Sequence, residues 1–285
     1  MGQLRDRMEA DLLLAGYSPS TRRIYVGYAR LFAKHFRRSP AEMGETEIRQ
    51  YLLHMVEGQK ASHETYRQIR AALSFLYTIT LKRPTEVAYL PVRRTRRKLP
   101  IILSGTEVQR LLDAIRSPKY RVIGMVQYAA GLRIYEACRL QPRDIDSKRM
   151  VIHVRNGKGG RDRYTVLSAR LLEYLRDYFR RVRSRPWLFP GETVEGHASP
   201  HTFRRVFRDA VTHAGIAKRI TPHTLRHSFA THLLESGVDI AVIQVLLGHA
   251  SLRATQIYVH VTVEHIGRVI SPLDLLGTPA AVPLG

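Results

Sequence analysis

A stretch rich in proline and arginine divides this chain of 285 residues into two parts. It reads RPTEVAYLPVRRTRRKLP, residues 83–100, and Pro84, Pro91 and Pro100 disfavour a continuous helix through it. The segments on both sides have the apolar spacing of helices, so we predict a linker between two folded parts. A solvated loop is one interpretation of its charge. We favour the other, that the linker lies along a phosphate backbone.

Helical spacing of apolar side chains recurs in the first part of the chain. In residues 18–36, Ser18 is a candidate N-cap and Pro19 occupies the first helical position. Residues 45–57 and 62–81 carry similar apolar stripes. Arginine and lysine occupy the polar positions of these segments. The first part is therefore predicted to be a small helical bundle with a basic surface.

The second part is predicted to be mainly helical with one small antiparallel β-sheet. A new helix pattern begins at Ser104. The next helix is nearly apolar and is interrupted at Gly131. The segments MVIHV and RDRYTVL favour β-branched residues and alternate in polarity. Between them lies the glycine-rich turn RNGKGG, so we expect a hairpin with Lys158 at or near its tip. The rest is expected to be helical to about residue 270.

The excess of basic residues indicates the class of partner. There are 46 lysines and arginines against 24 acidic residues, a formal net charge of +22. Such a field attracts a polyanion, usually nucleic acid, although a basic solvated surface or a membrane association is the alternative. One cysteine, Cys138, excludes an internal disulfide and fits a reducing cytosol. No apolar run approaches the ~18 residues of a membrane span, so we expect a soluble cytoplasmic protein that does not bind membranes.

Three histidines and an arginine gather in HTLRHSFATH, residues 223–232. Thr221 and Pro222 before it are a strong helix start, so His223 falls in the first turn and Arg226 follows one turn later. The free N–H groups of a helix N-terminus favour a phosphate, and arginine presents a planar fork to two of its oxygens. The segment is therefore a candidate phosphate site.

A metal site is the alternative for this segment. His223 and His227 are spaced i, i+4, as two metal ligands on one helix would be. However, no glutamate follows His223 and no cysteine cluster exists, so the zinc patterns fail. We predict no metal and no other cofactor, and expect His227 and His232 to be packing or surface residues.

Two further segments contain candidate functional residues. The segment VDIAVIQVLLGHASLRATQIYVHV predicts a helix that ends at Gly248, with His249 in the turn and Tyr258 nine residues later. A simple helical packing unit would look the same. The turn NGKGG lacks the Gly-x-x-x-x-Gly-Lys-Ser/Thr pattern, so nucleotide hydrolysis is not indicated, but Lys158 on such a turn can reach a substrate.

Four segments in this order resemble the tyrosine recombinases, also called the phage integrase family, and among them the compact Xer-like type. They are AAGLRIYEACRLQPRDID, NGKGGRDRYTVL, HTLRHSFATHLLESG and LLGHASLRATQIYVHV. The resemblance covers about residues 104–265 as motifs, and the first third resembles the family's helical core-binding domain more weakly. It implies a SAM-like DNA-binding domain over residues 1–86, a basic linker over 87–103, and a catalytic domain with a C-terminal tail over 104–285.

The resemblance also implies a set of catalytic residues, namely Arg133, Lys158, His223, Arg226, His249 and Tyr258. Tyr258 would be the nucleophile, Lys158 the general acid, and the two arginines would neutralise the reacting phosphate. Glu136 matches an acidic position of the family and would have a supporting role. Tyr135 departs from the pattern, because relatives often have a small polar residue there.

A protein of this family would cleave one DNA strand through a 3′-phosphotyrosyl bond and rejoin it to another, without ATP. The implied partners are double-stranded DNA and other copies of the chain, monomeric when free and tetrameric on synapsed DNA. A type IB-like topoisomerase or a catalytically silent DNA-binding regulator is the alternative, although a regulator needs neither Tyr258 nor Lys158. The chain's length favours a simple Xer-like or mobile-element recombinase.

Overall fold

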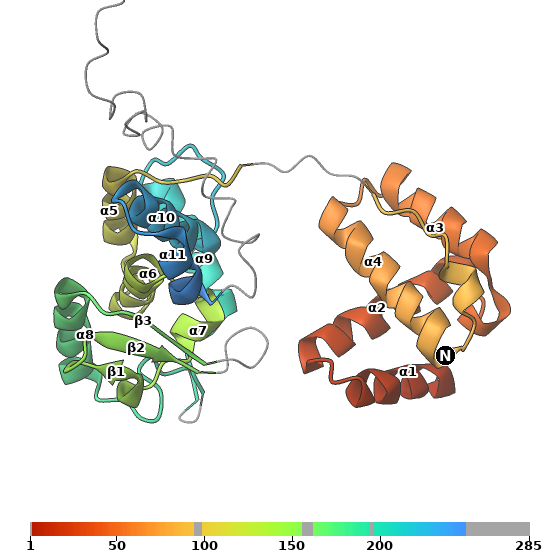
Figure 1. The fold of residues 1–285 in the computed structure, drawn as a ribbon, viewed down its shortest axis with the longest axis horizontal. Helices are drawn as coiled ribbons and strands as arrows, with labels where there is room; N and C mark the ends of the chain where they lie inside the picture. The colour runs from red at the N-terminus through yellow and green to blue at the C-terminus, as the bar shows by residue number, and fades with distance from the viewer. Residues whose placement is uncertain (1, 94–98, 156–161, 194–195, 249–285) are drawn as a thin grey trace, which may run out of the picture. The chain divides into compact units, whose positions relative to one another are not determined.

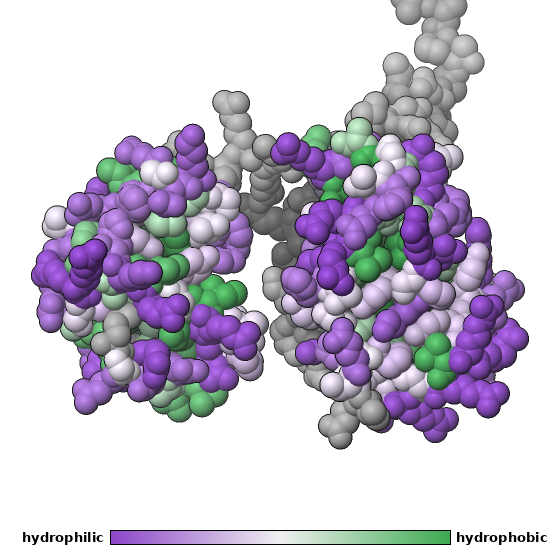
Figure 2. Space-filling model, turned by 180° about the vertical axis from the view of Figure 1, so that it is seen from behind, coloured by the Kyte–Doolittle hydropathy of each residue, from purple (hydrophilic) through white to green (hydrophobic). Residues whose placement is uncertain are grey.

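The structure is a computed structural model that describes residues 2–93, 99–155, 162–193 and 196–248. The chain divides into two compact units, Met1–Arg97 and Lys98–Gly285, each with its own hydrophobic core (Figure 1). Hydrophilic residues cover most of the face of both units that Figure 2 shows, and apolar residues form separate patches there. No helix within the described ranges is long and apolar enough to cross a membrane.

The N-terminal unit is a helical bundle, as the apolar spacing predicts. Its elements are α1 (Gly2–Leu14), α2 (Pro19–Phe36), η1 (Pro40–Glu42), α3 (Glu45–Glu57), α4 (His63–Phe75), the π-helical turn η2 (Leu76–Thr80) and η3 (Pro84–Val87). The Ser18 hydroxyl accepts a hydrogen bond from the Thr21 amide at 3.3 Å, which confirms the predicted N-cap of α2. Aliphatic and aromatic side chains form the core together, and Phe32 lies edge-on to Tyr51 and Tyr77.

The segment that follows η3 remains packed on this unit as far as Arg93. Leu90 is buried in the bundle core. The Tyr66 hydroxyl donates to the carbonyl of Pro91 at 2.8 Å, and Nη1 of Arg93 donates to the carbonyl of Ala61 at 2.9 Å. These contacts make residues 90–93 part of the packing of the N-terminal unit.

The C-terminal unit is mainly helical with one small antiparallel sheet, which confirms the predicted fold class. Its elements are α5 (Gly105–Ala114), α6 (Pro118–Ala130), α7 (Ile134–Cys138), η4 (Pro142–Asp144), β1 (Ile145–Asp146), β2 (Val151–Val154), β3 (Arg163–Val166), α8 (Ala169–Val182), α9 (Pro200–His213), α10 (Pro222–Glu235) and α11 (Ile240–Leu247). The strand order is β1-β2-β3, and Ile152 of β2 pairs with Ile145 and Thr165. Strands β2 and β3 are the predicted hairpin strands. Strand β1 is too short to show an alternating pattern in the sequence.

Helix α6 is central to the packing of this unit. It packs against α5, α7, α8, α10 and strand β3, and its side chains Ile123 and Val126 are fully buried. Helix α11 packs against β3 and α10, and α9 packs against α5 and α7 (Figure 1). Helix α6 therefore lies close to α7 and to α8 and α10, two of the helices that follow the sheet.

One expectation for this unit is wrong, because the chain between α8 and α9 is not helical. Residues 184–193 and 196–198 form a loop in which Pro190 and His197 make an antiparallel bridge. Pro186 and Pro190 lack the amide hydrogen that a helix requires, and Gly191 follows them. The loop places the single tryptophan, Trp187, beside α7.

Candidate active site

A glycine turn at the end of α6 sets the position of Arg133. Gly131 has a φ of 65°, the left-handed conformation that ends many helices. A Cβ at this position would lie 2.5 Å from the ring of Phe229 on α10, so packing also requires glycine. The buried Leu132 follows, and Arg133 becomes the N-cap residue of α7. The predicted interruption at Gly131 is confirmed, and it places Arg133 at the start of a new helix.

The carboxylate of Glu136 lies at the centre of a group of arginines. Its Oε2 accepts the backbone N–H of Arg133 at 2.8 Å, and its Oε1 accepts Nη1 of the same residue at 2.8 Å. From β3, Arg163 donates to the two oxygens with Nη1 and Nη2 at 3.0 and 2.7 Å. From α10, Nη1 of Arg226 lies 3.9 Å from Oε2. We call Arg133, Glu136, Arg163 and Arg226 the arginine cluster.

The charge of Glu136 is stable within this cluster. Burial by itself would raise the pKa of Glu136, because its side chain is only 7% exposed. The hydrogen bond and the charge of Arg163, together with the contacts of Arg133, outweigh burial and lower the pKa to about 2. The carboxylate is therefore ionised at neutral pH, so it holds the arginines in place and does not transfer protons.

Arg226 connects three helices through its guanidinium group. Arg226 is only 4% exposed, and a buried arginine normally requires partners for its guanidinium group. Nη1 donates to the carbonyl of Gly131 at the end of α6, and Nη2 donates to the carbonyl of Leu247 at the end of α11, both at 2.6 Å. Nε of Arg163 donates to the neighbouring Leu246 carbonyl at 2.9 Å. Cations at the C-terminus of α11 also compensate its helix dipole.

His223 lies in the first turn of α10, as Thr221 and Pro222 predict. Its side chain reaches solvent, but the surrounding protein removes part of its hydration. This desolvation, followed by the charges of Arg226, Arg204 and Arg133, lowers the pKa of His223 below its ordinary value. The imidazole is consequently neutral at pH 7 and has a nitrogen able to accept a proton.

The other two histidines of α10 are packing residues. Burial, with the charges of His223 and Arg226, lowers the pKa of His227 to about 4. Nδ1 of His232 makes a 2.9 Å hydrogen bond with the hydroxyl of Tyr128 on α6. In the part of the chain that the structure describes, no group of three or more histidine, cysteine, aspartate or glutamate side chains is arranged to hold a metal ion.

Arg163 is the member of the cluster to which sequence reasoning gave no role. A signal for it existed, since Arg163 and Thr165 share one face of β3 and the Thr165 side chain is buried. An arginine on the buried face of a strand requires an acidic partner. Glu136 is that partner, but the two positions are 27 residues apart, so the pairing depends on how α7 packs against the sheet.

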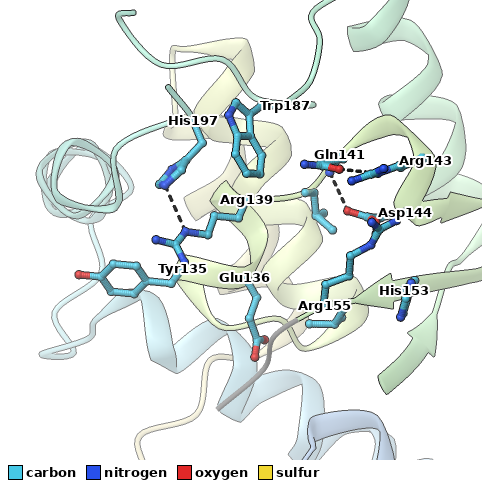
Figure 3. Close-up of a pocket in the computed structure, with 12 residues that line it drawn as sticks. Tyr135, Glu136, Arg139, Gln141, Arg143, Asp144, His153, Arg155, Trp187 and His197 are labelled. Atoms are coloured by element: carbon cyan, nitrogen blue, oxygen red, sulfur yellow. Dashed lines mark hydrogen bonds and ion pairs between the residues drawn. The ribbon is translucent and has the colours of Figure 1, made fainter. Parts of the chain in front are cut away.

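A hollow of about 460 Å³ lies beside α7, next to the cluster (Figure 3). Its polar and aromatic lining comprises Tyr135, Glu136, Arg139, Gln141, Arg143, Asp144, His153, Arg155, Trp187 and His197. Nε of Arg139 donates to Nε2 of His197 at 3.2 Å, and Arg155 pairs with the buried Asp144 at 2.7 Å. The wall of this hollow therefore combines three arginines with two carboxylates, one of which pairs with Arg155.

Three of the predicted site residues, Lys158, His249 and Tyr258, lie outside the described residues. The structure describes the chain on both sides of Lys158, where β2 ends at Val154 and β3 begins at Arg163. It also describes α11 and its C-cap Gly248, directly before His249. The structure thus brings Arg133 and Arg226 together and places His223 on the helix of Arg226, while the roles of the other three residues depend on the motifs.

Comparison with known families covers both units. Residues 102–265 match the model of the phage integrase family, which is more than half of the chain. Residues 4–86 match the model described as phage integrase, N-terminal SAM-like domain. Each compact unit therefore contains one of the two family matches.

Similar proteins support the same assignment. A putative integrase/recombinase, y4qK, of Sinorhizobium fredii is 42% identical over 294 residues, covering 99% of this chain and 92% of the relative. A tyrosine recombinase XerA of Thermococcus onnurineus is 36% identical over 273 residues, or 93% of each chain. A lambda integrase dimer bound to a COC′ core site shares the fold, with a TM-score of 0.74 and 20% identity over 90% of this chain and 94% of that one.

These matches decide between the interpretations of the sequence. They favour strand exchange over the topoisomerase and over the silent regulator, and they agree with the four ordered motifs. The chain therefore belongs to the phage integrase family and is a Xer-like tyrosine recombinase.

Proposed function

We propose that Tyr258 cleaves one strand at a specific DNA site, forms a 3′-phosphotyrosyl bond, and passes that strand to a second duplex. The observation that supports this assignment is the arginine cluster, in which Arg133 and Arg226 come from different helices to one buried carboxylate. Two fixed guanidinium groups beside a helix N-terminus can neutralise the charge that develops on a reacting phosphate. A protein that only binds DNA has no need for this arrangement.

Each proposed residue has a defined part in the reaction. The oxygen of Tyr258 attacks phosphorus, while His223 accepts the phenolic proton. The bond from phosphorus to the 5′ oxygen breaks, and Lys158 protonates that oxygen so that it leaves as a hydroxyl. Arg133, Arg226 and a hydrogen bond from His249 stabilise the pentavalent state. A 5′ hydroxyl of another strand then attacks the phosphotyrosine. Because the phosphotyrosine conserves the energy of the cleaved phosphodiester bond, rejoining needs no ATP.

Double-stranded DNA is the proposed partner of both units. The net charge of +22 supports it, because phosphate contacts dominate the affinity of DNA-binding proteins. We propose that residues 1–86 form the core-binding domain, 87–103 the linker and 104–285 the catalytic domain, with the start of the linker packed on the first domain as far as Arg93. A DNA-acting enzyme of this kind would be cytoplasmic and, given its integrase relatives, part of a mobile element.

We further propose a monomer when the protein is free and a homotetramer on two synapsed duplexes. The lambda integrase relative, which was solved as a dimer on its core site, supports assembly on DNA. Mass photometry should find single copies without DNA and complexes of four copies on two duplexes. Complexes that never exceed one copy per duplex would contradict the tetramer.

The main experiment targets the nucleophile. The protein's own site is first recovered by sequencing DNA that is covalently trapped on it in cells, and a nicked suicide duplex with that site is then incubated with each variant. Tyr258→Phe removes only a hydroxyl, so DNA binding should persist and the covalent adduct should disappear. Tyr174→Phe is the matched control, because Tyr174 is an exposed tyrosine of α8 and should leave adduct formation unchanged. An adduct formed by the Tyr258→Phe protein would show that another residue is the nucleophile.

A further inference from the structure

An exposed tyrosine at the start of α7 supports an arginine of α9. Tyr135 is 52% exposed and follows Arg133 by two positions. In Figure 3 it lies at the rim of the hollow, with its ring turned away from Trp187 and His153. The guanidinium carbon of Arg204 lies 5.5 Å from the centre of this ring, within the range of a cation–π contact.

Arg204 is on the exposed side of α9 and has no acidic neighbour in the described ranges. Arg204 is exposed and borders the buried stripe of α9, which includes Phe203 and Phe207. No carboxylate of a described residue lies within ion-pair distance of the Arg204 guanidinium, unlike Arg133 and Arg163, which share Glu136. The Tyr135 ring is thus the neighbour that orients this side chain.

The charge of Arg204 acts on the candidate active site. Together with Arg226 and Arg133, Arg204 is one of the cations that lower the pKa of His223. Glu136 is already shared among the other arginines of the cluster. An additional cation next to this group is unfavourable until an anion approaches, and DNA carries a phosphate on each side of the one that is cleaved.

We propose that Arg204 binds a DNA phosphate adjacent to the cleaved one and that Tyr135 is a positioning residue that holds Arg204 in place for this contact. The proposal rests on the proposed roles of Arg133 and Arg226 at the cleaved phosphate. It assigns a function to an exposed aromatic side chain that lies two positions after Arg133. A small residue would leave the Arg204 side chain without a surface to pack on.

The test replaces single phosphates of the suicide duplex by neutral methylphosphonates, on either side of the cleaved position. On unmodified DNA, Arg204→Ala should weaken binding and slow cleavage at subsaturating DNA by about tenfold, the effect of one charge-assisted hydrogen bond. Tyr135→Ser should weaken DNA binding and slow cleavage by about threefold. Tyr135→Phe should bind and cleave like the wild type because it keeps the ring. Arg180→Ala, which removes an exposed arginine of α8, is the control for net charge.

The decisive result is the combination of the variant with the modified DNA. One methylphosphonate should weaken the wild type about tenfold and have no further effect on Arg204→Ala, since both changes remove the same contact. The dependence of log affinity on log salt should also be shallower by about 0.9 for Arg204→Ala. Binding is measured in a Tyr258→Phe background too, so a failure of the nucleophile assignment does not affect this test.

The proposal would be overturned if Arg204→Ala bound and cleaved DNA like the wild type. It would also be overturned if the losses from Arg204→Ala and from the methylphosphonate multiplied at every position. If the wild type binds but forms no adduct, the proposed function fails, and the phosphate contact is still judged from the binding data.

Discussion

Ion pairs of the same length occur in very different surroundings in the two units. In the N-terminal unit, Arg67 and Glu64 lie 2.7 Å apart with side chains 67% and 56% exposed. In the C-terminal unit, Arg163 and Glu136 also lie 2.7 Å apart, but their side chains are 8% and 7% exposed. Exposed pairs contribute about 0–1 kcal/mol, whereas removing one partner of a buried pair costs about 3–5 kcal/mol. The burial of an ion pair, and not the distance between its charges, therefore indicates how much its loss would destabilise the fold.

The same contrast extends to the other polar side chains of the interior. Among the described residues, the buried polar or charged side chain of the N-terminal unit is Thr80, and its core is otherwise aromatic and aliphatic. The C-terminal unit buries Arg226, Asp144, Gln127 and several hydroxyl groups. Polar groups inside a protein reduce stability unless they are paired. The C-terminal unit, which contains the candidate active site, therefore has the interior with more buried polar groups.

The largest expected effect tests whether the buried arginine acts only as a charge. Arg226→Lys keeps the positive charge, but one ammonium group cannot reproduce the planar fork that reaches the carbonyls of Gly131 and Leu247. Single-turnover cleavage of the suicide duplex should be slower by about 10²–10³-fold. The exposed counterpart, Arg67→Lys, should cleave at the wild-type rate. Wild-type cleavage by Arg226→Lys would show that only the charge matters at this position.

The second prediction compares a buried with an exposed carboxylate in the C-terminal unit. Glu136→Gln leaves its arginines without an anion and should lower the free energy of unfolding by about 3 kcal/mol. Asp177→Asn, which removes the partner of Arg181 on α8, should change it by less than about 0.5 kcal/mol. Urea unfolding followed by the fluorescence of Trp187 measures both, because the single tryptophan lies in this unit.

This second prediction has a defined pH dependence. The folded state lowers the pKa of Glu136 from its ordinary value of 4.5 to about 2. The stabilising contribution is thus fully present above pH 4.5 and is lost as the pH falls toward 2. The difference between wild type and Glu136→Gln should shrink over that interval. A difference that stays constant down to pH 2 would mean that the carboxylate charge does not stabilise the cluster.

The smallest expected effect concerns the exposed histidine beside the buried cluster. A lowered pKa keeps His223 neutral at pH 7, so cleavage at subsaturating DNA should decline only at pH values below 6.5. Below the midpoint the rate should fall about tenfold per pH unit, as expected for one protonation. His223→Gln should be slower at neutral pH and should lack this acidic limb. Persistence of the limb in His223→Gln would assign it to another group.

Local signals in the sequence were sufficient for the helices that carry the site. Thr221 and Pro222 begin α10, and Gly131 and Gly248 end α6 and α11, because caps and left-handed glycines act within one turn of the chain. The predicted residues Arg133 and Arg226 meet at Glu136, in agreement with a supporting role for that acid. Lys158, His249 and Tyr258 remain predictions from the ordered motifs.

What the sequence did not indicate depends on contacts between distant segments. The role of Arg163 follows from the packing of β3 against α7 and α11, which no local pattern encodes. The stretch between α8 and α9 is not the predicted helix, because Pro186 and Pro190 lack the amide hydrogen that a helix requires. The cation–π contact between Tyr135 and Arg204 joins α7 to α9, and it became visible only with the tertiary structure.

The carbonyl groups that Arg226 binds have a consequence for the order of events during synthesis. Arg226 reaches back 95 residues to Gly131 and forward 21 residues to Leu247. Contacts of such separation form late in folding, because the intervening segments must be ordered first. In a growing polypeptide, Arg226 lacks the Leu247 carbonyl as a partner until α11 has left the ribosome and packed. An incomplete or partly unfolded copy of this chain therefore lacks contacts that fix its buried arginine.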